Sequence, residues 1–344
     1  MLAYTKDLKV FRSKDFNYNF DMKTGFTQLW GRTVDEDPEV APFPVIADIE
    51  ITEVCTGPGV GSPQGGACKF CYKSNVPHKG SVMSLELAKS VINKLPKELT
   101  QIAFGVDAQC ESNPEWYEIF AYARRSGFIP NVTVADITEE TAVKLASMCG
   151  AAAVSRYVDK NWCYDSIEKL TRNGLKQVNI HILLSSETLP WVYETIEDAK
   201  TDPRLAGLNA IVFLSLKQKG RGVHFNRVSQ EQYKEVVDKC LEKEISFGFD
   251  SCGCHRFLEA VKDHKRFKEF SMMAEPCEST AQSVYANARG EVFPCSFTEG
   301  TPGWEDGLFI PDFKTFDEIW NHERVQKFRN NLLLNKRRCP IYDV

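Results

Sequence analysis

The chain has 344 residues, and its apolar content of 43% and charged content of 26% are typical of a globular protein with one large domain or with one large and one small domain. Its net charge of -5 gives no sign of a general nucleic-acid or membrane-surface binder. The sequence has no apolar run of about 18 residues and no N-terminal apolar signal segment, so we expect a cytoplasmic protein without a membrane partner.

From Val45 onward, strand and helix patterns alternate along the chain. Runs that are β-rich or have a period of two predict six strands, at residues 45–52, 101–106, 131–135, 151–155, 177–185 and 210–216. Amphipathic runs with capping residues predict six helices, at residues 84–95, 113–127, 138–150, 164–174, 189–200 and 229–243. Six strand–helix units in series indicate an α/β protein with a partial (β/α)6 TIM-like barrel over residues 45–246. We expect residues 1–44 to be an N-terminal extension that covers this barrel.

The alternation stops after the sixth helix, and short segments, turns and cysteines replace it. Residues 283–295, SVYANARGEVFPC, predict a β-hairpin that turns between Ala288 and Gly290. We therefore expect a small cysteine-rich α+β domain over residues 247–344.

Three of the twelve cysteines, Cys55, Cys68 and Cys71, lie in a Gly- and Pro-rich loop directly after the first expected strand. In (β/α) barrels the chemistry takes place at this end of the strands. Two kinds of site suit three clustered thiolates. One is a structural zinc site with His78 as the fourth ligand. The other is a [4Fe–4S] cluster, which usually takes four thiolates and, with three, keeps one iron open for a substrate or cofactor.

A Cys-x-aromatic-Cys motif that closes a loop after the first strand of a six-unit barrel resembles the radical S-adenosylmethionine superfamily. The commonest spacing in that family puts three residues between the first two cysteines, whereas this chain has twelve, residues 56–67. The resemblance extends over nearly all of the chain from residue 45. It implies that Cys55, Cys68 and Cys71 hold the cluster and that Phe70 packs near the adenine of S-adenosylmethionine.

Two further segments occupy positions at which that family contacts S-adenosylmethionine. After the second strand, Asp107, Ala108 and Gln109 stand in place of a Gly-Gly-Glu segment whose backbone binds the amino group of the cofactor. At the end of the fourth strand, Ser155 and Arg156 stand where the family often places polar groups against the ribose or the carboxylate, and an arginine would pair with a carboxylate through two hydrogen bonds. From the residues alone, an ordinary loop and a solvated arginine also fit these patterns.

A second group of cysteines lies in the last third of the chain. Cys277, twelve residues, Gly290, four residues and Cys295 form a pattern that resembles the twitch and SPASM extensions of radical S-adenosylmethionine enzymes, which hold auxiliary iron–sulfur clusters. The number of cysteines fits one auxiliary [4Fe–4S] cluster, and a four-cysteine zinc site is the alternative. The expected ligands are Cys277, Cys295, Cys339 and one of Cys252 or Cys254. We favour Cys254 as the fourth ligand, because Cys252 ends a strand pattern.

These resemblances imply a radical S-adenosylmethionine enzyme that generates a 5′-deoxyadenosyl radical and abstracts a hydrogen from a peptide, a small molecule or a modified nucleotide. It would require two [4Fe–4S] clusters, S-adenosylmethionine and an electron donor such as flavodoxin or ferredoxin. A basic loop after the sixth strand, with Lys217, Lys219 and Arg221, suits either an anionic group of the substrate or solvent. The alternative from another class is a non-catalytic zinc protein, with one three-cysteine-plus-histidine site and one four-cysteine structural site.

Overall fold

The computed structural model describes residues 1–5, 7–342 and 344, and its largest element is a ten-stranded sheet. The strands are β5 (Ile46–Glu50), β6 (Gln101–Gly105), β7 (Ile129–Val134), β8 (Ala151–Ser155), β9 (Gln177–Leu184), β10 (Ala210–Ser215), β11 (Phe247–Phe249), β12 (Ser283–Ala286), β13 (Glu291–Phe293) and β14 (Leu308–Phe309). Their order in the sheet is β11-β10-β9-β8-β7-β6-β5-β12-β13-β14, and all pairs from β11 to β12 are parallel. The six predicted strands are confirmed as β5 to β10, and β11 and β12 add one parallel strand at each side.

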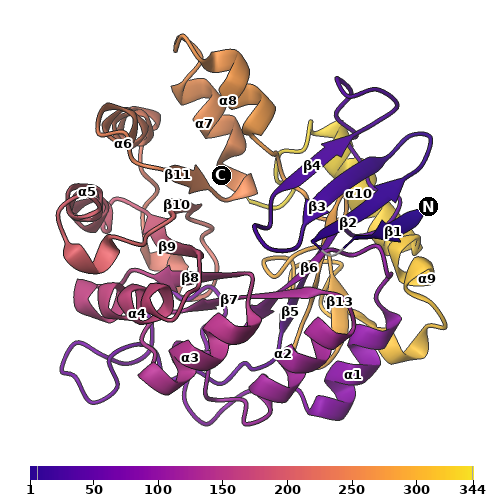
Figure 1. The fold of residues 1–344 in the computed structure, drawn as a ribbon, viewed down its shortest axis with the longest axis horizontal. Helices are drawn as coiled ribbons and strands as arrows, with labels where there is room; N and C mark the ends of the chain where they lie inside the picture. The colour runs from indigo at the N-terminus through magenta and orange to yellow at the C-terminus, as the bar shows by residue number, and fades with distance from the viewer. Residues whose placement is uncertain (6, 343) are drawn as a thin grey trace.

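Helices cover the outer face of the curved sheet (Figure 1). Each predicted helix is present, and the capping box at Ser229 and Gln232 is formed. Two starts differ from the prediction. The buried Asn113 amide donates to the carbonyls of Ile51 and Met83, and that helix begins three residues later. The fourth helix begins four residues earlier, at Lys160, because the Asp159 carboxylate caps it there. The helices are α1 (Leu85–Lys94), α2 (Trp116–Arg125), α3 (Glu139–Met148), α4 (Lys160–Arg172), α5 (Leu189–Asp198) and α6 (Gln230–Glu242).

The main hydrophobic core lies between the outer face of the sheet and these helices. Along β9, Ile180 and Ile182 belong to this core and are fully buried. Asn179 and His181 alternate with them, point to the inside of the barrel and are half-buried. The inside of the barrel is therefore more polar and more open than the layer between strands and helices.

The N-terminal segment forms a second, antiparallel sheet, which the sequence analysis did not predict. Its strands are β1 (Leu2–Tyr4), β2 (Leu8–Arg12), β3 (Asn17–Asp21) and β4 (Thr27–Trp30). It packs near the start of the barrel strands, because Lys9 Nζ donates to the carbonyl of Leu99 at 2.5 Å and the Tyr18 hydroxyl donates to that of Glu98 at 2.6 Å. This sheet therefore lies at the end of the barrel opposite to the cysteine loop.

The C-terminal region joins short elements to the edge of the barrel sheet. The predicted hairpin is confirmed, because β12 and β13 pair antiparallel around a turn in which Gly290 has a φ of +79°. No helix in the described part of the chain is both long enough and apolar enough to cross a lipid bilayer. The remaining elements are α7 (Cys254–Ala260), α8 (Phe267–Met273), α9 (Phe316–Trp320), α10 (Glu323–Leu334) and four 3-10 turns, η1 (Pro203–Leu205), η2 (Gly220–His224), η3 (Ser251–Gly253) and η4 (Ile310–Asp312).

Candidate metal centres

The loop after β5 brings its three cysteines together beside Tyr157. Burial and the Cys68, Cys55 and Cys71 thiols raise the pKa of the Tyr157 hydroxyl well above its ordinary value, so all three thiols lie in its surroundings. Tyr157 also forms a hydrogen bond with Cys68. Phe70 stacks on the Tyr157 ring, with the ring centroids 5.5 Å apart. The three cysteines and the aromatic residue of the motif therefore share one site at the carboxyl ends of the barrel strands.

The backbone of this loop is folded closely around the sulfur atoms. Gly57 has a φ of +77°, and a Cβ there would lie 1.8 Å from the carbonyl oxygen of Gly66, so the loop requires glycine at this point. The N–H of Gly57 donates to Cys55 Sγ at 3.3 Å, and the N–H of Ala108 donates to the same sulfur. Hydrogen bonds to sulfur stabilise a thiolate and tune the potential of an iron–sulfur cluster.

Two of the thiols in this loop need a positively charged partner before they ionise. Burial raises the pKa of the Cys55 thiol and raises that of Cys68 to about 12, so thiolates here need a strong positive partner such as iron. No three His, Cys, Asp or Glu side chains of the described residues converge where a single ion would sit. In a [4Fe–4S] cluster each thiolate binds a different iron, so its ligands stand further apart than those of one zinc ion. His78, the fourth ligand of the zinc alternative, is exposed.

The segment after β6 lies against the cysteine loop. Gln109 donates to the carbonyl of Gly57 at 2.9 Å and accepts from the Thr56 hydroxyl at 3.2 Å. The buried Asp107 carboxylate accepts three backbone N–H groups of its own loop, those of residues 109, 111 and 112. Asp107 therefore shapes the loop, whereas Ala108 and Gln109 face the first cysteine and its neighbours.

Arg156 does not lie at this site, which differs from the expectation for a cofactor contact. Its side chain is 1% exposed, and its Nη2 pairs with Glu194 of α5 at 2.6 Å, within the helical layer. Because side chains alternate along an extended chain, the residues on either side of Arg156 point into the barrel instead. Ser155 hydrogen-bonds to Tyr157, and Tyr157 reaches the thiols. Tyr157 thus occupies the position that the sequence analysis gave to Arg156.

The second cysteine group gathers around Cys252. A hydrogen bond between Cys252 and Cys277 lowers the pKa of the Cys252 thiol and raises that of Cys277. Burial and, to a smaller extent, the charge of Cys252 raise the pKa of both the Cys295 and the Cys339 thiols, so both lie near Cys252. The pKa of the Cys295 thiol is raised to about 12. Backbone N–H groups donate to the sulfurs of Cys277, Cys295 and Cys339. Four thiols with such N–H donors are a donor set suited to an iron–sulfur cluster.

Cys254, the favoured fourth ligand of the sequence analysis, lies apart from this group. It is the first residue of α7 and is fully buried, and burial raises the pKa of its thiol to about 11. The charges around it belong to Glu275, Arg337 and Arg338, not to the other cysteines. The thiol that lies with Cys277, Cys295 and Cys339 is therefore that of Cys252, not that of Cys254.

The basic loop after β10 holds the two cysteine groups side by side. Lys219 Nζ donates to the carbonyls of Phe297 at 3.2 Å and Glu299 at 2.6 Å, close to the second group. Arg221 Nε donates to the carbonyl of Cys68 at 2.7 Å, within the first group. Lys217 is buried, pairs with Asp250 and contacts Cys252. All three basic side chains therefore bind protein groups, which is not the arrangement of a solvated loop.

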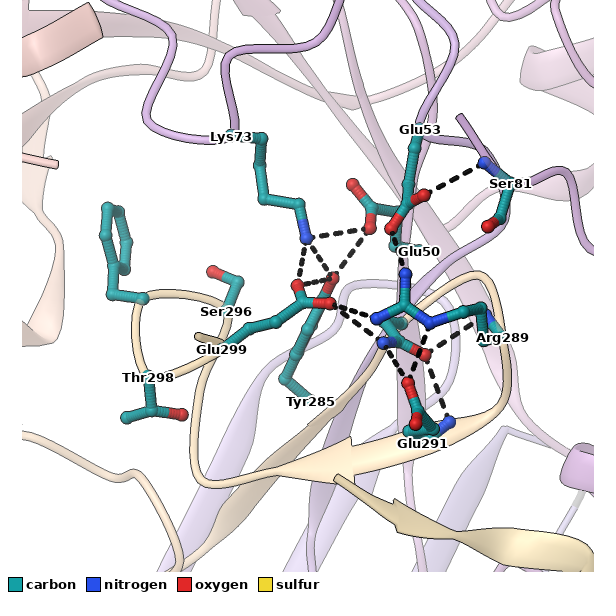
Figure 2. A network of polar contacts seen from close by, with 12 residues as sticks. Glu50, Glu53, Lys73, Ser81, Tyr285, Arg289, Glu291, Ser296, Thr298 and Glu299 are labelled. Carbon is teal, nitrogen blue, oxygen red and sulfur yellow. Dashed lines mark hydrogen bonds and ion pairs between the residues drawn. The ribbon is translucent and has the colours of Figure 1, made fainter. Parts of the chain in front are cut away.

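Figure 2 shows a network of ion pairs that joins the first cysteine loop to the C-terminal hairpin. Lys73 Nζ lies 3.0 Å from Glu50 at the end of β5, 2.9 Å from the Tyr285 hydroxyl on β12 and in contact with Glu299. The three ionic side chains are 9–13% exposed. Arg289 in the hairpin turn pairs with Glu299 at 3.0 Å. The network therefore ties the loop that holds one cysteine group to the segment that holds the other.

Lys73→Met should lower the free energy of unfolding by about 3 kcal/mol, because it leaves the buried Glu50 and Glu299 carboxylates without their shared cation. Chemical denaturation of wild type and variant measures the difference. Lys79→Met is the matched control, since Lys79 belongs to the same loop and is exposed, and it should change the value by less than about 0.5 kcal/mol. Equal effects of the two substitutions would show that the network does not stabilise the fold.

Comparisons with known proteins bear on both centres. Residues 277–341 match the SPASM family, described as an iron–sulfur cluster-binding domain. The fold is similar to that of SuiB from Streptococcus suis, with a TM-score of 0.68 and 10% identity over 95% of this chain and 90% of that one. SuiB bound to S-adenosylmethionine gives a TM-score of 0.66 and 11% identity over 96% and 90%. No curated sequence is significantly similar to the chain. The similarity in fold confirms the predicted fold class, and the match of residues 277–341 agrees with the predicted resemblance to SPASM extensions.

Proposed function

We propose that the chain is a radical S-adenosylmethionine enzyme with one auxiliary iron–sulfur cluster. The observation that carries the proposal is the grouping of Cys55, Cys68 and Cys71 at the carboxyl ends of the barrel strands, around Tyr157. Three thiolates leave one iron of a [4Fe–4S] cluster open for S-adenosylmethionine. The SPASM match of the C-terminal segment and the similarity in fold to a protein solved with S-adenosylmethionine support the proposal.

When bound, the cluster supplies the electron that splits S-adenosylmethionine into methionine and a 5′-deoxyadenosyl radical, which takes a hydrogen atom from the substrate. The chain itself holds and orients the reactants. We assign the amino group of S-adenosylmethionine to the backbone carbonyl of Gln109, because the carbonyl of Ala108 already accepts the N–H groups of Ala135 and Asp136. The stacked rings of Phe70 and Tyr157 offer an apolar wall for the adenine and exclude water from the thiolates.

The auxiliary cluster would be held by Cys252, Cys277, Cys295 and Cys339. Its place beside the first site suits two roles, relay of an electron or contact with the substrate. Buried Lys217 next to Cys252 would offset part of the negative charge of a thiolate-bound cluster and so raise its potential. The electron donor, flavodoxin or ferredoxin, and the cytoplasmic location stay predictions.

Metal analysis tests the proposal against the zinc alternative. After anaerobic reconstitution we expect about eight iron and eight sulfide per chain, the content of two [4Fe–4S] clusters. Incubation with S-adenosylmethionine and dithionite should then release 5′-deoxyadenosine. Zinc bound in stoichiometric amount, with no uptake of iron, would refute the proposal.

A further inference from the structure

The inner faces of the barrel strands border a hollow that water can enter. β5 and β7 each have a neighbouring strand on both sides, yet Asp48 on β5 and Thr133 on β7 are exposed. Asp48 stands opposite Ala103 of β6, and Thr133 stands opposite Ala153 of β8. On its other side, Thr133 stands opposite Gly105 of β6 and Asp48 stands opposite Tyr285 of β12. Three of these four neighbours are small, and on their side they leave room for a ligand inside the barrel.

Two carboxylates face this hollow without a paired cation. Asp48 is reached by water but lies deep among protein atoms, and burial raises the pKa of its carboxyl to about 6. Glu278 lies on the same side of the sheet edge, because its carbonyl accepts the N–H of Ser283, the first residue of β12, and β12 pairs with β5 alongside Asp48. Within the described part of the chain we find no side-chain hydrogen bond or ion pair for either of them. Arg337, a nearby cation, is already paired with Glu275.

A cavity of about 380 Å³ lies at the free edge of β11 and joins this acidic region. Gly248 of β11 and Glu278 both line it. The other charged residues of its wall are neutralised, because Arg266 pairs with Glu269 and Glu275 pairs with Arg337. The rest of the wall is largely aromatic and includes Phe247, Phe249, Phe257 and Phe270.

We propose that this cavity binds an organic cation of the substrate, an alkylammonium or alkylguanidinium group. Aromatic faces attract cations, and Glu278 and Asp48 would gain the partner that they lack. A neutral or anionic group would leave both carboxylates unpaired in a partly desolvated space. The volume lies within the range of small-ligand sites. As a statement about the substrate, the inference rests on the proposed function, whereas binding of the cation does not.

Binding of small probes to the full reconstituted chain tests the inference. We expect n-pentylammonium and n-pentylguanidinium to bind with a Kd in the millimolar range, about what six to nine heavy atoms allow, and at least about tenfold more tightly than n-pentanol. Pentanoate should not bind. Ligand-observed NMR measures these affinities. N-acetyl-lysine methylamide and the free amine, compared side by side, show whether a peptide side chain or a free amine fits better.

Substitutions locate the binding. Glu278→Gln should weaken pentylammonium binding by about tenfold, and Asp48→Asn should weaken it in the same direction without altering a residue beside a cysteine. Glu305→Gln is the control, since Glu305 is an exposed carboxylate elsewhere in the C-terminal region. The inference is overturned if n-pentanol binds as tightly as the ammonium or if Asp48→Asn and Glu278→Gln both bind like wild type.

The outcome is independent of the proposed function. Cation binding in a protein that never cleaves S-adenosylmethionine would refute the proposed function and keep this site. Cleavage of S-adenosylmethionine in a protein that binds no cation would keep the function and refute the site.

Discussion

Replacing Cys55, Cys68 or Cys71 by alanine is expected to reduce reductive cleavage of S-adenosylmethionine by about a thousandfold or more. Each substitution removes one of the three iron ligands of the cluster at which S-adenosylmethionine would bind, and only that cluster has an iron left open for it. Anaerobic assays with dithionite, in which 5′-deoxyadenosine is quantified by mass spectrometry, measure the loss. The auxiliary cluster should still assemble, so about half of the iron should remain.

Two controls separate a lost ligand from a damaged fold. Cys149→Ala removes a buried thiol at the end of α3, away from both cysteine groups, and should retain full iron content and activity. His78→Ala should also retain iron, because this exposed histidine has no part in a three-thiolate cluster. Loss of the metal in His78→Ala would favour a three-cysteine-plus-histidine zinc site instead. Normal cleavage in Cys55→Ala would show that Cys55 is not a ligand of the reactive cluster.

The barrel could be predicted from the sequence because its signals are local. Period-two strands, capped amphipathic helices and short connections specify each strand–helix unit without knowledge of the rest. The N-terminal sheet carried one such signal, the alternation of Phe16, Tyr18 and Phe20 with asparagines, and these three side chains are indeed buried. Its other strands are short and partly exposed, so their sequences show no clear alternation of apolar and polar residues.

The site could be predicted only in part, for two different reasons. The misplacement of Arg156 was avoidable, because alternation after Ser155 puts Tyr157, not Arg156, on the inner side of the barrel. The wrong choice between Cys252 and Cys254 could not have been avoided, because the right choice depends on residues that are distant in the sequence. Asp250 caps the turn η3 and also pairs with Lys217 of another loop, which fixes the position of Cys252. Such long-range contacts leave no pattern in the local sequence.

The second large effect is expected from Cys252→Ala, which should lower iron from about eight to about four per chain by removing a ligand of the auxiliary cluster. Cleavage of S-adenosylmethionine without substrate should survive in part, whereas formation of substrate-derived product should fall much further. Cys277→Ala and Cys295→Ala should behave in the same way. Iron and sulfide analysis, with electron paramagnetic resonance of the reduced protein, distinguishes the two clusters.

Cys254→Ala is the matched comparison, since it removes a thiol only two residues away and leaves Cys252 in contact with Cys277. It should keep about eight iron per chain and show at most the modest destabilisation of a small buried cavity. Metal binding contributes to folding in a loop-rich region, so the comparison requires soluble protein whose first cluster is intact. If Cys254→Ala loses iron and Cys252→Ala keeps it, Cys254 is the fourth ligand, as the sequence pattern suggested. If both keep all their iron and form product normally, the second cysteine group consists of packed thiols and holds no cluster.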